Sequence, residues 1–229
     1  MRTTSKLGTS LAVLSVLLPL CTSAFAQETT VYDNSLTDLN RIVVANNGAE
    51  IGDEITLDPT TTQRTLADFK FEYFLSGNAN GNESAQLFIR MNDGPIVTEN
   101  NGTIAAHAPG TVLYTSPVLS LQPGVNTADA VPIPNTVNLT GDFTWSVVFQ
   151  GIDSGEIAGL RIYNPPTVGS SFSDFWQLNN GTWNAYTLTD GIPANFAARV
   201  TAVPEPTTFA YALLAGLAWI GFRGFKRRG

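Results

Sequence analysis

The feature that most restricts the fold of this 229-residue chain is a period-two alternation of apolar and polar side chains between residues 27 and 203. Four segments show it most clearly: residues 68–75, 85–91, 142–150 and 195–202. In the third, one face would carry Phe143, Trp145, Val147 and Phe149, and the other Thr144, Ser146 and Gln150. Successive side chains of a β-strand point to opposite faces of the sheet, so each segment is predicted to be a half-buried strand.

Weaker strand patterns occur in six further segments: 40–45, 52–57, 111–121 with a bend at Pro117, 157–163, 172–178 and 182–188. The last two flank Asn179-Asn180-Gly181, and Asn-Gly between aromatic-rich runs predicts a β-hairpin. The Pro-rich residues 123–134 are expected to form a long connection. With no helical periodicity, about ten short strands predict one all-β domain over residues 27–203, an antiparallel, jelly-roll-like β-sandwich.

The N-terminus has the three parts of a secretory signal peptide. Arg2 and Lys6 precede an apolar run over residues 7–20, and the small residues Ala24 and Ala26 follow it. This pattern predicts export and cleavage after residue 26, so that residues 1–26 are removed. The only cysteine, Cys21, precedes this site, and a lipoprotein signal is disfavoured because Leu20 stands where a small residue is needed.

The C-terminus also has three parts. Pro204, Glu205 and Pro206 are followed by an apolar segment over residues 207–222 and by a basic tail over residues 223–229. The tail contains Arg223, Lys226, Arg227 and Arg228. The apolar segment is predicted to be a single transmembrane helix whose basic end stays cytoplasmic, and a buried core helix is the less favoured alternative.

In this order, the three C-terminal parts resemble the PEP-CTERM sorting signal over residues 204–229. The resemblance implies recognition by an exosortase, a membrane-bound processing enzyme of Gram-negative bacteria. It implies a protein held in the inner membrane, then cleaved near the motif and moved to the cell surface or the extracellular space, in organisms that commonly make exopolysaccharide. Pro204, Glu205 and Pro206 would then be read by another enzyme and would not be catalytic.

Charge and composition exclude several classes of function. Residues 27–203 contain 18 acidic and six basic side chains, a net charge of −12. Nucleic-acid binding is not expected from such a body, because phosphate contacts require a basic face. After signal cleavage the chain has no cysteine, which excludes disulfides, a cysteine nucleophile and thiolate-bound metals.

No catalytic constellation is evident, so the chain is predicted not to be an enzyme. The single histidine, His107, lies among small residues and is expected in an exposed loop. Glu50, Asp53 and Glu54 are close in sequence and are interpreted as a solvated acidic turn. A glycoside hydrolase, which needs two converging carboxylates, stays the second alternative.

Two binding hypotheses remain open. No metal ligands or cofactor are predicted, although three oxygen-rich loops (residues 78–83, 92–94 and 153–156) could hold calcium. Trp176 and Trp183 could stack on sugar rings if exposed, although a core role is favoured for both. Trp176 and Tyr186 are expected on one face of the sheet, and Phe175 and Trp183 on the other. The sequence thus predicts an exported surface or matrix protein with a structural or adhesive role, or alternatively a carbohydrate-binding module for exopolysaccharide.

Overall fold

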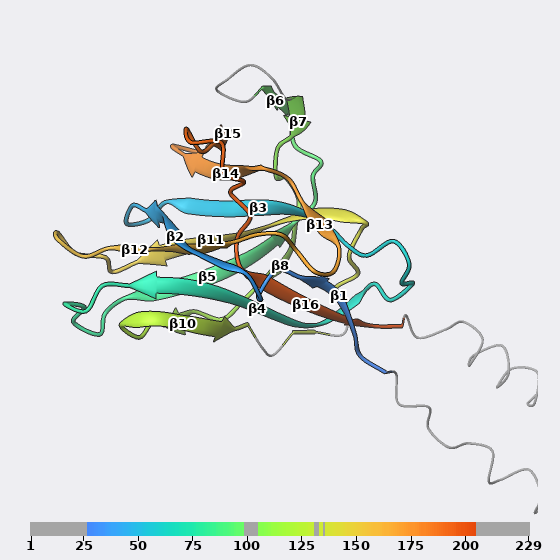
Figure 1. Cartoon of the computed structure of the whole chain (residues 1–229), viewed down its shortest axis with the longest axis horizontal. Helices are drawn as coiled ribbons and strands as arrows, with labels where there is room; N and C mark the ends of the chain where they lie inside the picture. Colours follow the sequence, from blue (N-terminus) through green and yellow to red (C-terminus); the bar gives the residue numbers. More distant parts are fainter. Residues whose placement is uncertain (1–26, 99–104, 131–132, 135, 205–229) are drawn as a thin grey trace, which may run out of the picture.

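The computed structural model describes residues 27–98, 105–130, 133–134 and 136–204, and within these ranges the regular structure is entirely β-strand (Figure 1). Every strand pairing is antiparallel. The strands form a six-stranded sheet, an eight-stranded sheet and one separate hairpin. The prediction of an all-β, antiparallel fold is therefore confirmed.

The six-stranded sheet has the order β1-β16-β4-β12-β2, and β10 pairs with β4 outside this path. Its strands are β1 (Thr29–Asp33), β2 (Asp38–Ala45), β4 (Thr65–Leu75), β10 (Gly124–Asp129), β12 (Ala158–Tyr163) and β16 (Ala198–Val203). The first and last strands of the domain are neighbours, with Thr29 opposite Ala202. The domain therefore begins and ends at one place on the sheet.

The eight-stranded sheet has the order β15-β14-β3-β11-β5-β8, with β13 pairing with β3 and β9 with β5. Its strands are β3 (Glu50–Thr56), β5 (Ser84–Arg90), β8 (Val112–Thr115), β9 (Leu119–Ser120), β11 (Asp142–Gln150), β13 (Ser170–Ser171), β14 (Asp174–Asn179) and β15 (Thr182–Thr187). The hairpin of β6 (Ile96–Thr98) and β7 (Ala105–His107) contacts β15 and lies beyond β14 and β15, at the top of Figure 1.

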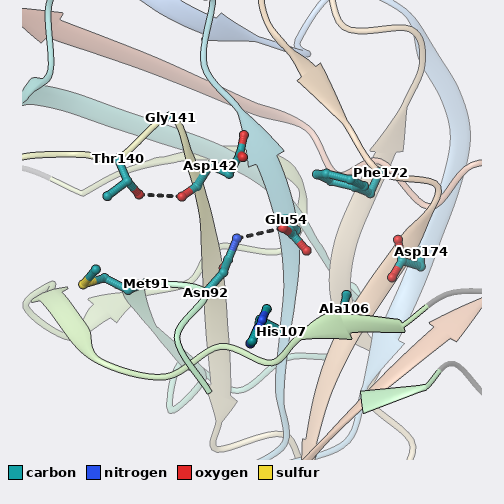
Figure 2. Close-up of a pocket in the computed structure, with 10 residues that line it drawn as sticks. All are labelled: Glu54, Met91, Asn92, Ala106, His107, Thr140, Gly141, Asp142, Phe172 and Asp174. Carbon is teal, nitrogen blue, oxygen red and sulfur yellow. Dashed lines mark hydrogen bonds between the residues drawn. The ribbon is translucent and has the colours of Figure 1, made fainter. Parts of the chain in front are cut away.

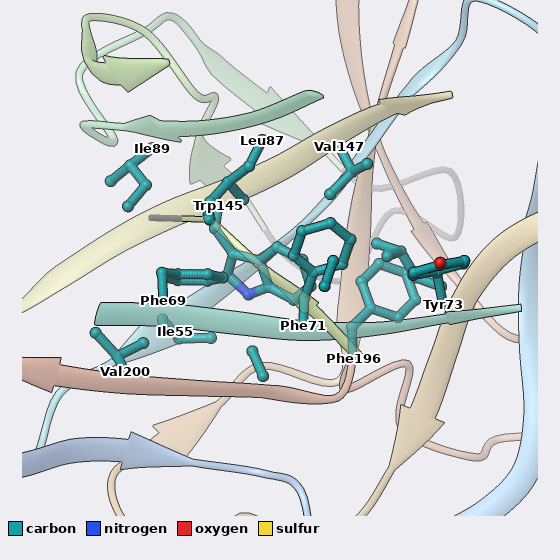
Figure 3. Close-up of a cluster of buried hydrophobic side chains, with 14 of the residues drawn as sticks. Ile55, Phe69, Phe71, Tyr73, Leu87, Ile89, Trp145, Val147, Phe196 and Val200 are labelled. Carbon is teal, nitrogen blue, oxygen red and sulfur yellow. The ribbon is translucent and has the colours of Figure 1, made fainter. Parts of the chain in front are cut away.

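Apolar side chains from both large sheets form one core, as expected for two sheets packed face to face. Trp145 of β11 lies at its centre and is fully buried (Figure 3). Its ring centroid is 5.3 Å from that of Phe69, 5.9 Å from that of Phe71 and 6.1 Å from that of Phe196. Large aromatic rings contributed by both sheets thus hold the layers together.

The predicted alternating segments correspond to strands, and the predicted segment 142–150 coincides with β11. The Asn-Gly hairpin joins β14 to β15, and both turn residues have positive φ, 50° for Asn180 and 78° for Gly181. The predicted bend at Pro117 separates β8 from β9. The expectation of about ten strands was too low, since there are 16 in the described ranges.

The Pro-rich segment differs from its prediction, because residues 124–129 form β10 and pair with β4. Pro123 ends the preceding turn, and Gly124 has a φ of 96°, which a side chain would disfavour. The strand starts at Gly124, directly after Pro123. Turn formers at both ends of a short strand made the whole stretch look like a connection.

Candidate functional site

A cavity with a volume of about 590 Å³ lies on the outer face of the eight-stranded sheet (Figure 2). The β6–β7 hairpin closes one side of it, and the ends of three sheet strands form its floor. Its lining residues are Glu54, Met91, Asn92, Ala106, His107, Thr140, Gly141, Asp142, Phe172 and Asp174. A cavity of this size is in the range of small-molecule sites.

Strand β3 explains how a carboxylate reaches this cavity. Ile51, Asp53 and Ile55 point into the core, so the alternating residues Glu50 and Glu54 point outward. Thr144 of β11 is directly opposite Glu54, and Asp142 begins the same strand two residues earlier. The cavity therefore collects side chains that the pleat directs away from the core.

On the other side of β3, the neighbouring strand brings a second carboxylate to Glu54. Asp174 begins β14, lines the cavity with Glu54 and lies close enough for its charge to raise the pKa of that group. Like charges held close together on neighbouring strands destabilise a sheet. Their presence in a cavity is therefore a signal of a functional site.

The carboxyl group of Glu54 has a pKa of about 7, well above its ordinary value of 4.5. Burial raises this pKa most, and the negative charges of Asp174 and Asp142 raise it further, while His107 lowers it. Asn92 Nδ2 donates a hydrogen bond of 2.8 Å to Glu54 Oε1, and Thr144 Oγ1 donates one of 2.7 Å to Asn92 Oδ1. This chain of bonds fixes the orientation of the Glu54 side chain.

Trp176 lies next to this carboxyl group beneath the hairpin. It is 0% exposed and forms a small second core with Ala108 and Ala185, against which Ala106 of β7 packs. Its buried indole N–H makes no hydrogen bond of ordinary geometry, yet it is close enough to Glu54 to lower the pKa of that group. The indole N–H of Trp176 is thus a buried donor close to Glu54 that makes at most a weak hydrogen bond.

The structure bears out the favoured core role for Trp176 and corrects the predicted sheet faces of these aromatic side chains. Trp176 is buried and cannot stack on a sugar ring, while Trp183 is half-buried and stacks over the Arg90 guanidinium at 5.5 Å. The expected pairing across the hairpin was also wrong, because Phe175 is opposite Tyr186 and stacks on it at 5.6 Å. Trp176 and Trp183 therefore share the outer face.

The interpretation of Glu50, Asp53 and Glu54 as a solvated turn was likewise wrong, since all three lie in β3. Glu50 is 4% exposed and pairs with Arg90, whose Nε and Nη2 donate bonds of 2.9 and 3.2 Å. Such two-point pairing compensates the burial of the carboxylate. Apolar neighbours on either side of the acids allow this segment to pair as a strand.

Asp53 is fully buried on the core side of the same strand. Its carboxyl group accepts hydrogen bonds from the Phe196 backbone N–H at 2.9 Å and from Ser171 Oγ at 2.9 and 3.0 Å. Burial raises its pKa well above the ordinary value of 3.8. This carboxyl group joins β3 to β13 and to the segment before β16, which is a structural task.

The loops proposed for calcium use their carboxylates internally. Glu83 accepts backbone bonds from Asn80 and Gly81, and Asp93 accepts two bonds from Thr111. Within the described parts of the chain, no three His, Cys, Asp or Glu side chains lie close enough together to hold a metal ion.

His107 is exposed, as expected, but it lies in β7 and not in a loop. Its Nδ1 is 3.0 Å from the Gly94 carbonyl oxygen, and the imidazole borders the cavity (Figure 2).

The terminal predictions fall almost entirely outside the described residues. These are the signal residues Ala24 and Ala26, the motif residues Glu205 and Pro206, the segment 207–222, and the tail residues Arg223, Lys226, Arg227 and Arg228. Pro204 is described and follows β16 directly. Over residues 27–204 with their gaps, no helix has the length and hydropathy of a membrane span.

Asp142 and Asp174 were not predicted as site residues, and Asn92 was named only as part of the loop 92–94 that could hold calcium. Asp142 and Asp174 each begin a strand that the sequence predicts wholly or in part. Their position at a strand end is the signal that could have drawn attention to them. Their convergence depends on non-local pairing of β14, β3 and β11. Comparisons of the chain with protein-family models, curated proteins and solved structures found no match.

Proposed function

We propose that this chain is an exported protein of the bacterial surface or extracellular matrix, and that its β domain has an adhesive, non-enzymatic role in binding exopolysaccharide. The proposal joins the C-terminal signal, which resembles PEP-CTERM, to the cavity on the outer face of the eight-stranded sheet. Exosortase and the inner membrane are its expected partners before processing. A jelly-roll connectivity of the sandwich is part of the same proposal.

The position of the last strand supports the sorting part of the proposal. β16 ends at Val203, immediately before the motif residue Pro204. A processing enzyme that acts at or after this motif would meet a chain segment beyond the folded sheet. Cleavage there would release the domain with its core complete, because the core residues end at Ala202.

The observation that supports carbohydrate binding is the composition of the cavity wall. Glu54, Asp142 and Asn92 offer planar polar groups at the mouth of a small-molecule-sized cavity, and Phe172 is 42% exposed beside them. Sugars present hydroxyl groups at the ring edge and C–H groups on the ring face. Hydrogen-bonding carboxylates and amides next to an exposed aromatic ring match both.

The sorting part is tested by replacing Pro204, Glu205 and Pro206 together with Ala in the producing organism. Export should continue, and C-terminal processing should stop, as measured by the mass of the protein in membrane and extracellular fractions. Unchanged processing would refute the sorting proposal.

The binding part is tested by retention of the full chain, kept in mild detergent, on the exopolysaccharide of that organism. Phe172→Ala should weaken retention roughly fivefold, in line with the loss of about 1 kcal/mol from one aromatic contact. Val118→Ala, at an exposed apolar residue that does not line the cavity, is the matched control. Equal retention of both variants would contradict binding at this cavity.

A glycoside hydrolase is the second candidate, and the pKa of Glu54 favours it. A carboxyl group that holds its proton near pH 7 beside other carboxylates is the arrangement of a general acid and its partner. Release of reducing ends from the polysaccharide, abolished by Glu54→Gln, would establish hydrolysis. The absence of any release would leave binding alone.

A further inference from the structure

We infer that the β6–β7 hairpin is a lid, and that its displacement uncovers Trp176 and Trp183 as an aromatic platform for the sugar rings of a polysaccharide. This inference rests on the proposed function and adds a second, covered part to the binding surface on the outer face of the eight-stranded sheet. It is based on how the hairpin is attached, on how little holds it down and on what lies beneath it.

Within the described residues, the backbone hydrogen bonds that attach the hairpin to the sheet are all at its base. They extend the pairing of β5 with β8, since the Met91 N–H donates to the Thr111 carbonyl oxygen at 2.9 Å and the Gly110 N–H to the Met91 carbonyl oxygen at 2.8 Å. The two strands beyond this base contact β15, although β11, β3 and β14 stand between β5 and β15 in the sheet order. The hairpin therefore extends from its base across the outer face (Figure 1).

Two glycines shape the base of the hairpin. A Cβ on Gly94 would lie 2.7 Å from the Ala108 carbonyl oxygen, and a Cβ on Gly110 would lie 2.8 Å from the Gly94 backbone nitrogen. A side chain at either position would push the two chain segments apart. The hinges of lids consist of a few such positions at the ends of an element, and small residues are common there.

Few side chains hold the far end of the hairpin on the sheet. Val97 and Ala106 are directly opposite each other in the β6–β7 register, and both pack against the small cluster of Ala108, Trp176 and Ala185. Three of these five residues are alanines, so the apolar area that docking removes from water is small. Regions with few buried apolar contacts open locally at a cost below that of global unfolding.

Between its base and this contact, the hairpin spans open space. Ala106 and His107 of β7 line the cavity on one side, and Glu54 and Asp142 of the sheet line it on another (Figure 2). The hairpin is therefore packed on the sheet over only part of its length. Displacing it breaks the contacts around Trp176 and leaves the main core between the two sheets intact.

Opening would expose two tryptophans that share one face of the sheet. Trp176 is opposite Ala185 and Leu178 is opposite Trp183, so the two indoles are diagonal neighbours on β14 and β15. Trp183 is half-buried and packs against the cluster that contains Trp176, which the hairpin covers completely. Neighbouring indole rings supply the large, rigid apolar surface on which the C–H faces of successive sugars can stack.

The first measurement compares two tryptophans that are both 0% exposed, Trp145 and Trp176. The full chain in mild detergent is treated with a short pulse of hydroxyl radicals, and the oxidation of each indole is measured by peptide mass spectrometry. Trp176 should be oxidised at least tenfold faster than Trp145, because displacement of the hairpin exposes Trp176 and only global unfolding exposes Trp145. Equal rates would overturn the lid.

A matched pair of variants then shifts the position of the hairpin. Val97→Asp places a charge against the Trp176 cluster and favours the open form, whereas Ile96→Asp makes the same change of charge at a neighbouring residue that is 65% exposed. Val97→Asp should raise the oxidation of Trp176 about tenfold and leave that of Trp145 unchanged. Ile96→Asp should change neither rate.

The same pair of variants tests the platform through retention on the exopolysaccharide of the producing organism. A surface that is accessible only in a minor open form binds with an affinity reduced by the fraction of open molecules. Val97→Asp should therefore increase retention about fivefold, and Ile96→Asp should not. Addition of Trp183→Ala to Val97→Asp should abolish the gain, because one of the two rings is then missing.

The outcomes separate this inference from the proposed function. Retention of the unsubstituted chain without any gain in Val97→Asp would overturn the platform, while binding at the cavity survives. Retention of no form of the chain would overturn the binding proposal and the platform together. The comparison of Trp145 with Trp176 uses the unsubstituted chain and does not depend on any variant. A variant that fails to fold is recognised by faster oxidation of Trp145.

Discussion

The inner and outer faces of the eight-stranded sheet place similar residues in opposite roles. On the inner face, Trp145 centres the main core and Asp53 ties strands together through hydrogen bonds. On the outer face, Trp176 lies beneath a hairpin and Glu54 borders an open cavity. Asp53 and Glu54 are consecutive residues, so the direction of the strand pleat alone decides which acid is structural and which is available to a ligand.

The largest difference is expected between the two buried tryptophans. Trp145→Ala should reduce the free energy of unfolding by about 4 kcal/mol, because a core surrounded by strands on both sides cannot close the resulting void. Trp176→Ala should cost about half as much, since its smaller cluster lies under a single hairpin. Urea unfolding followed by circular dichroism measures both losses.

Trp145→Phe is the control for this pair. It removes an indole N–H that has no hydrogen-bond partner and keeps most of the ring volume, so it should cost much less than Trp145→Ala. If the Trp176 variant were the less stable of the two Ala variants, the outer cluster would be the true centre of stability and the contrast between the faces would fail.

The two neighbouring acids should differ by a smaller amount. Asp53→Ala leaves the buried Phe196 N–H without its acceptor and should cost about 2 to 3 kcal/mol. Glu54→Ala removes the hydrogen bond from Asn92 but also relieves repulsion from Asp174, so its net effect should be below about 1 kcal/mol. Thermal unfolding of both variants under the same conditions makes the comparison, and equal losses would contradict it.

The smallest expected effect is on the pH dependence of stability. The Glu54 pKa is about 7 in the folded chain against an ordinary 4.5, so between these pH values the folded state retains a proton that the unfolded state has lost. Unfolding free energy should therefore decrease as pH rises through this window, by about 1 to 2 kcal/mol after allowance for solvent screening.

Asp53 contributes to the same trend, because its pKa is also raised. Glu54→Gln should flatten the slope between pH 5 and 7 without abolishing it, and Asp174→Asn should move the Glu54 transition to lower pH. Denaturant unfolding at half-unit pH intervals tests this. A slope that is unchanged in the Gln variant would show that Glu54 does not titrate as described.

The alternation in the sequence was sufficient to predict the all-β class and most of the central strands. It failed where strands are short or interrupted, as in β10 between Pro123 and Ala130. It predicted β3 only in part, as residues 52–57, because the three acids of this strand resemble a turn. Side-chain periodicity reports burial against one layer. It does not report the partner strand, because pairing in this sheet joins residues more than 100 positions apart, such as Gly52 and Trp176.

The candidate site was less predictable for the same reason. Glu54 was identified but assigned to a turn, and its neighbours Asp142 and Asp174 come from strands that are far away in sequence. A core role was favoured for Trp176, but the hairpin that covers it was not predicted, because it consists of two three-residue strands with little periodicity. A fold class follows from local patterns, whereas a site requires the strand order.

The pairing of β1 with β16 makes the domain a transferable unit. Since Thr29 is opposite Ala202, a short linker could join the two ends, and new termini could be opened at the Asn180-Gly181 turn on the other sheet. The same proximity would allow the sandwich to be inserted into a surface loop of an unrelated protein with little disturbance to its host. A chain built in this way can exchange the segment that follows β16 without altering the outer face of the eight-stranded sheet.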